Sequence, residues 1–172
     1  AIACLEPTLR GKEPSLTVVT VPFQHIAVQW AEELKEFQPV CTFRGGDFRT
    51  AMANLTSDIK MGLRKAAVVV AVQNTAATDD FLRLTGELAS HVKHRTLVAD
   101  EVHGLGAPAF RRALADFYEA RLGLSATPQR WFDDDGSAVL QSYFERTVYT
   151  FGIHEALNWV DPATGETVLC PY

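Results

Sequence analysis

Cysteine and long apolar runs are scarce in this sequence of 172 residues. The three cysteines, Cys4, Cys41 and Cys170, are too few and too scattered for a disulfide framework or a zinc module, which favours a reducing, cytoplasmic location. The longest apolar stretch, residues 66–72, has the length of a buried strand and is too short to cross a membrane. We therefore expect no membrane partner.

A phosphate-binding loop of the form G-x-x-x-x-G-K-[ST] is also missing. Gly11-Lys12 is followed by Glu13, and Glu6 stands where the first glycine would be, so this pair cannot cradle phosphates. The chain begins at Ala1 with neither Met nor a basic segment, and we expect part of the protein to lie upstream of it.

An excess of positive charge is absent as well, because the formal net charge is −5. The acidic excess lies in residues 131–172, which hold seven acidic residues and one arginine. A net-acidic chain cannot attract a polyanion through a general field, so nucleic-acid binding would need local groups and helix N-termini. One local cluster of cationic residues is a candidate for binding nucleic acid, and it fits a solvated helical face equally well. The cluster comprises Arg44, Arg49, Lys60, Arg64 and Lys65.

The sequence does contain enough apolar surface for one core, since 47% of its residues are hydrophobic. β-Branched runs alternate with segments whose apolar residues recur at helical spacing. The pattern predicts strands at 16–21, 40–43, 67–72, 96–99, 122–125 and 147–151, and helices at 26–37, 50–65, 81–92, 110–117, 137–144 and 154–159. Strands separated by such helices indicate a three-layer α/β fold with a mainly parallel central sheet.

Polar residues gather where four of these strands end. In an open parallel sheet, ligands bind outside the carboxyl ends of the strands. Each group alone could cap a helix or form a turn, but together they indicate a functional edge. The groups are Thr20, Pro22 and Gln24; Gln73, Asn74 and Thr75; Asp100, Glu101 and His103; and Ser125 and Thr127.

Among these groups, the Asp100-Glu101 pair is the strongest candidate for catalysis or metal binding. Two adjacent carboxylates at the end of an apolar strand repel one another and lose solvation, a cost usually met by a cation or by catalytic use. Asp100 could hold Mg²⁺ through its water shell while Glu101 orients an attacking water. Asp100 could instead only cap the next segment, which would leave Glu101 and His103 unexplained. We interpret His25 and Trp30 as packing or helix-surface residues.

These residues also resemble a known family. Asp100-Glu101-Val102-His103 resembles the DExH form of motif II in superfamily 2 helicases and translocases, and residues 122–128 resemble their Ser-Ala-Thr motif III. Residues 21–30 resemble motif Ia, and residues 73–75 occupy the place of motif Ib or its neighbour. Within the superfamily, residues 100–135 are most similar to xeroderma pigmentosum group B helicases and restriction-enzyme motor subunits.

The resemblance implies two RecA-like lobes with ATP and Mg²⁺ between them and a nucleic-acid strand crossing both. Residues 1–172 would form most of the first lobe, a single domain. The phosphate loop would lie upstream of Ala1, which falls inside the helix after that loop, and the second lobe would follow Tyr172. We therefore expect the isolated chain to have no ATPase activity.

The resemblance also assigns roles to residues. Asp100 would coordinate Mg²⁺, Glu101 would activate the hydrolytic water, and His103 would link the nucleotide site to the second lobe. Ser125 and Thr127 would couple hydrolysis to movement.

Contacts with the strand, DNA in the first place with RNA left open, would come from Thr20, Pro22, Gln24, Gly45, Gly46, Gln73, Asn74 and Thr75. The alternative is a lobe kept only to bind nucleic acid or protein, without ATPase activity.

Overall fold

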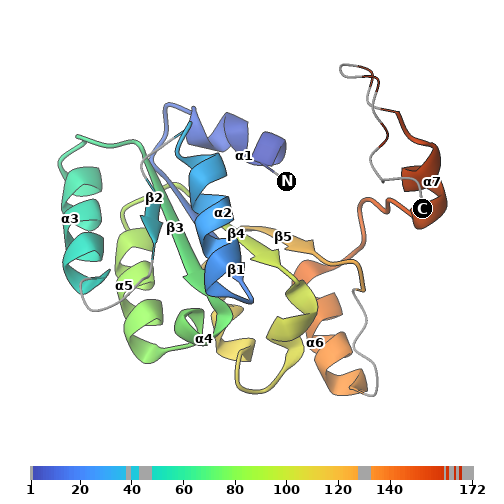
Figure 1. The fold of residues 1–172 in the computed structure, drawn as a ribbon. Coiled ribbons are helices and arrows are strands. Elements are labelled where there is room, and N and C mark those ends of the chain that lie inside the picture. Colours follow the sequence, from blue (N-terminus) through green and yellow to red (C-terminus); the bar gives the residue numbers. More distant parts are fainter. Residues whose placement is uncertain are drawn as a thin grey trace.

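The structure is a computed structural model, and it describes residues 2–37, 40–42, 48–127, 133–160, 162, 165 and 167. Its centre is a sheet of five strands in the order β2-β3-β1-β4-β5. The strands are β1 (Ser15–Val21), β2 (Val40–Thr42), β3 (Ala66–Val72), β4 (His94–Asp100) and β5 (Ala120–Leu124). All four pairings between them are parallel, as the alternation of strands and helices predicted (Figure 1).

Helices cover the sheet on both faces, which confirms the three layers. The longer helices are α1 (Ile2–Leu9), α2 (Gln24–Leu34), α3 (Phe48–Lys60), α5 (Asp79–Ala89) and α6 (Asp134–Phe144). Four short elements complete the described chain: α4 (Gln73–Ala76), the 3₁₀ turns η1 (Val102–Gly106) and η2 (Arg111–Ala113), and α7 (Ile153–Asn158).

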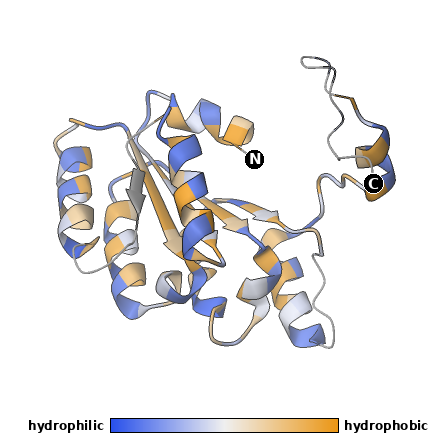
Figure 2. Cartoon of the chain, in the orientation of Figure 1, coloured by the Kyte–Doolittle hydropathy of each residue, from blue (hydrophilic) through white to orange (hydrophobic). Residues whose placement is uncertain are grey.

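The alternation of side chains along each strand divides the core into two halves. Leu97 and Ala99 of β4 pack in the half formed with α3, α5 and α6, whereas Val98 packs in the half formed with α1 and α2. Figure 2 shows hydrophobic strands behind the hydrophilic outer side of α2. Since successive strand residues point to opposite faces, Asp100 follows Val98 and faces the α2 side.

Two predicted elements are wrong. In place of the helix expected at 110–117, the structure has only the 3₁₀ turn η2 followed by turns. Phe110, Leu114 and Phe117 nevertheless pack against the core, as their helical spacing predicted. The turns that follow η2 bring these apolar side chains to the core, so their spacing does not require an α-helix.

The strand expected at 147–151 is also missing, since none of these residues belongs to a strand. Val148 and Tyr149 are 74% and 72% exposed. A β-branched and aromatic segment forms a strand only where another strand offers it a hydrogen-bonding edge, and no strand of the described chain does so here. None of the described helices is long and apolar enough to cross a membrane.

Candidate active site

Four strand ends meet at one edge of the sheet, as the sequence predicted. Val21 of β1 lies opposite Val72 of β3, and Asp100 of β4 lies opposite Leu124 of β5. The polar groups that follow these strands therefore share one rim. The rim brings together side chains that are up to about 100 residues apart in the sequence.

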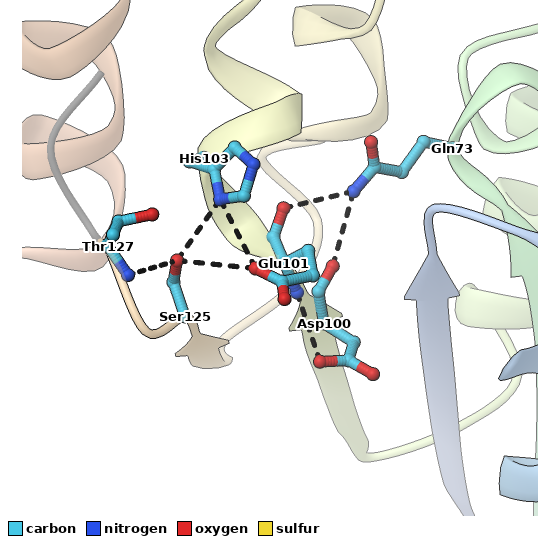
Figure 3. Close-up of polar contacts among 6 residues, drawn as sticks. All are labelled: Gln73, Asp100, Glu101, His103, Ser125 and Thr127. Carbon is cyan, nitrogen blue, oxygen red and sulfur yellow. Dashed lines mark hydrogen bonds and ion pairs between the residues drawn. The ribbon is translucent and has the colours of Figure 1, made fainter. Parts of the chain in front are cut away.

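Asp100 occupies the last position of β4, and both of its carboxylate oxygens accept hydrogen bonds. The indole Nε1 of Trp30, on α2, donates to Oδ2 at 2.8 Å. The backbone N–H of Glu101 donates to Oδ1 at 3.0 Å (Figure 3). Two donors from different elements fix the orientation of this carboxylate, and each oxygen keeps a lone pair for a further partner.

Glu101 turns the chain sharply after β4. Its backbone has φ 47° and ψ 52°, in the left-handed region that non-glycine residues seldom adopt, and it precedes the 3₁₀ turn η1. Its half-exposed carboxylate lies 3.3 Å from Nδ1 of His103, and Oε2 accepts from Oγ of Ser125 at 3.5 Å. The two adjacent carboxylates thus have different partners.

His103 and Ser125 connect the turn after β4 to the segment after β5. Nδ1 of His103 lies 3.1 Å from Oγ of Ser125, and the backbone N–H of Thr127 donates to the same hydroxyl oxygen at 3.1 Å. Glu101 and Ser125 both meet the same ring nitrogen. A serine-hydrolase relay needs the acid and the nucleophile on opposite ring nitrogens, so this geometry does not form one.

Gln73 is a buried polar residue of the rim, at 5% exposure. Its Nε2 donates to the backbone carbonyls of Asp100 and Glu101, each at 3.2 Å. Figure 3 shows the amide of Gln73, the first residue of α4, pointing towards the turn. The side-chain Nε2 is thus engaged within the protein, and the expected phosphate contacts of residues 73–75, through backbone amides and hydroxyls, stay a prediction.

The side chain of Thr20 also points into the protein. Its side chain is 1% exposed, and its hydroxyl donates to the carbonyl of Val98 at 3.5 Å, so it is closed off from a strand outside the sheet. The outward residues of the rim are Pro22, Gln24, Asn74 and Thr75, which are exposed or partly exposed. Gly45 and Gly46 lie outside the described residues.

Two aromatic residues at the rim escaped the sequence reasoning. Phe23 is 62% exposed, and its ring stacks on His25 with centroids 5.7 Å apart and an interplanar angle of 8°. Trp30 was interpreted as packing, yet its indole holds Asp100. The sequence offered a signal for each. An indole N–H needs an acceptor once it is buried, and Phe23 lies beside the end of a predicted strand, where an exposed aromatic ring would have no packing role.

The cationic cluster considered above behaves as a solvated helical face. Arg49 pairs with Asp80, Lys60 with Glu87 at 3.5 Å, and Arg64 with Asp58 at 3.6 Å. Its Arg44 is outside the described residues. These pairs engage three of the five residues of the cluster with carboxylates, which lowers the net positive charge that it offers to a polyanion.

The donor set of the rim fits a magnesium ion held by the Asp100 carboxylate, through the water shell of the ion. Within the part of the chain that the structure describes, no three metal-binding side chains cluster together. Mg²⁺ in nucleotide sites typically binds one or two carboxylates, substrate phosphates and several waters, so a single well-oriented carboxylate is a sufficient protein contribution.

Three comparisons relate this chain to known proteins. The family model described as "Type III restriction enzyme, res subunit" matches residues 5–130. A protein of Haloarcula marismortui named as a DNA 3'-5' helicase, Rad25, is 29% identical over 119 residues, covering 69% of this chain and 17% of that protein. The helicase domain of Pyrococcus furiosus Hef superposes with a TM-score of 0.52 at 15% identity, covering 93% of this chain and 34% of that one, which supports the fold.

Proposed function

The chain belongs to the family of type III restriction enzyme res subunits, a group of superfamily 2 motor proteins, and from this premise we propose that it forms the first motor lobe of an ATP-dependent helicase or translocase. The observation that carries the proposal is the turn after β4. Asp100 and Glu101 stand side by side at a strand end, yet each carboxylate is oriented by its own partners.

In this proposal Asp100 holds Mg²⁺ and Glu101 orients the attacking water. The metal, when bound with ATP, would neutralise the charge that develops on the phosphates. Trp30 keeps the Asp100 carboxylate in one orientation, and the left-handed turn directs Glu101 away from it. Glu101 is half-exposed, so water can reach it from the rim.

His103, Ser125 and Thr127 form the proposed coupling path. Their contacts join the turn that holds Glu101 to the segment after β5. A movement of the turn would therefore displace that segment, and the reverse. His103 meets the Ser125 hydroxyl and Glu101 through the same ring nitrogen, which is not the arrangement of a nucleophilic serine, and we assign Ser125 and Thr127 to transmission. His103 would extend this path towards a second lobe.

The nucleic-acid strand is proposed to cross the outward part of the rim. Gln24, Asn74 and Thr75 offer amide and hydroxyl groups for phosphates, and exposed Phe23 offers a ring face to a base. DNA is the proposed partner, since the matched Haloarcula protein is named as a DNA helicase. The chain spans 17% of that relative, so we place the phosphate loop and the second lobe elsewhere in the full-length protein.

The test compares Glu101→Gln with Glu119→Gln in the full-length protein. Glu119 is an exposed carboxylate that pairs with Arg95 at the opposite edge of the sheet. Glu101→Gln keeps the shape but removes the negative charge that orients water, so strand-stimulated ATPase should fall by about a hundredfold or more while nucleotide still binds. Glu119→Gln should leave the rate unchanged.

Two results would contradict the motor assignment. Near-normal turnover of Glu101→Gln would make Glu101 a structural residue. A wild-type protein that binds the strand without hydrolysing ATP would identify the lobe as a binding module.

A further inference from the structure

We infer that Gln73 is a positioning residue for hydrolysis, because its side chain holds the backbone of the turn that presents Asp100 and Glu101. This inference rests on the proposed function and goes beyond it. It assigns to Gln73, the first residue of α4, a role at the hydrolytic site, whereas its position in the sequence suggested a contact with the nucleic-acid strand.

The side chain of Gln73 contacts the backbone of two consecutive residues, Asp100 and Glu101. One amide nitrogen, Nε2 of Gln73, donates to the carbonyl of Asp100 and to that of Glu101, each at 3.2 Å. The side chain is 5% exposed, so water does not compete strongly for either carbonyl. Two bonds from one planar amide fix the direction of both carbonyls at once.

The turn needs such a restraint because its backbone is unfavourable in isolation. Glu101 adopts φ 47° and ψ 52°, and a glutamate held there persists only where its surroundings determine it. If the turn relaxed towards an ordinary conformation, the Glu101 carboxylate would leave His103 and Ser125, and water would lose its orientation. The restraint is therefore tied directly to the group that acts on water.

The turn is also shaped to receive the amide. A Cβ atom at Gly104 would lie 2.3 Å from Oε1 of Gln73, 3.0 Å from its Cδ and 3.1 Å from its Nε2. No larger residue can occupy this position while the amide stays in place. The absence of a side chain at Gly104 thus makes room for the amide of Gln73, 31 positions earlier in the sequence.

Gln73 is also placed to transmit the binding of a nucleic-acid strand to the turn that holds Glu101. It is the first residue of the one-turn helix α4, and the next two residues, Asn74 and Thr75, are the proposed phosphate contacts. A displacement of α4 by a bound strand would shift the amide against the two carbonyls. The same residue would then sense the strand and set the geometry of hydrolysis.

The experiment uses Gln73→Met in the full-length protein, with Thr56→Val as a matched control. Methionine has a similar length and volume but no N–H donor, so the packing is retained and the restraint is lost. Thr56 is a buried residue of α3 whose hydroxyl bonds the carbonyl of Met52, away from the site, so its replacement reproduces the loss of a buried hydrogen bond.

We expect Gln73→Met to lower kcat of the strand-stimulated ATPase about ten- to a hundredfold, with the KM for ATP changed less than about threefold. Stimulation by single-stranded DNA should fall further than the basal rate. Thr56→Val should leave both rates unchanged while lowering the melting temperature by a similar amount. Gln73→Glu, which places acceptors where donors are needed, should be at least as impaired as the methionine variant.

The inference is overturned if Gln73→Met keeps a normal kcat, or if its rates fall only in proportion to lost folded protein. It is distinguished from the proposed function by the wild type and Glu101→Gln measured alongside. Hydrolysis that depends on Glu101 but not on Gln73 refutes this inference alone, whereas hydrolysis that is independent of Glu101 refutes the proposed function.

Discussion

Replacing Gly104 with alanine should destabilise the chain through Gln73. The new methyl group would lie 2.3 Å from Oε1 of Gln73, much closer than non-bonded atoms approach, so the buried amide must move. Its two hydrogen bonds to the carbonyls of Asp100 and Glu101 would then be lost. At roughly 0.5–1.5 kcal/mol for each bond, the free energy of unfolding should fall by about 2 kcal/mol.

This loss corresponds to a fall in melting temperature of about 4 to 8 °C for a domain of this size. Thermal unfolding followed by circular dichroism, with urea unfolding as an independent check, measures it. Gly86→Ala is the matched control, because a methyl group in the middle of α5 would meet only Phe117, at 3.8 Å. That variant should be more stable by about 0.5–1 kcal/mol, through higher helix propensity.

A double-mutant cycle decides whether Gln73 is the cause. In a Gln73→Ala background the clash is gone, so Gly104→Ala should cost almost nothing, and the coupling free energy should approach the full cost seen in the wild type. The reasoning is refuted if Gly104→Ala is as stable as the wild type, or if its cost is the same in both backgrounds.

Three further changes test the rim. Trp30→Phe keeps the ring but removes the donor to Asp100, so full-length ATPase should need several-fold more Mg²⁺ for half-maximal rate, and an unchanged Mg²⁺ titration would contradict the positioning role. Phe23→Ala should weaken binding of single-stranded DNA by about five- to tenfold, and Phe23→Trp should restore it; fluorescence anisotropy measures both, and equal affinities would exclude stacking. Replacing Ser125 and Thr127 together with alanine should leave ATP affinity within about threefold while translocation per ATP falls further than the ATPase rate; parallel loss of all activities and of thermal stability would reduce both residues to structural ones.

The order of elements and the position of the site were readable from the sequence because both follow from local rules. Runs such as residues 66–72 are too apolar and too β-branched to be anything but a buried strand. Once helices separate such strands, parallel pairing places their carboxyl ends together, so Asp100 and Ser125 had to share an edge. The errors at 110–117 and 147–151 have the same origin, since a local pattern reports which side chains prefer burial but not which partner is available.

The direction in which each rim side chain points was decided only by the tertiary structure. In the sequence, Thr20 and Gln73 are polar residues at strand ends like Gln24 and Asn74, yet the first two are buried and the second two are exposed. Gln73 turns inward because two carbonyls on a turn 27 residues later need donors and Gly104 leaves room for its amide. Such pairings depend on atoms that meet only after the sheet has formed, and no spacing within a strand or helix encodes them.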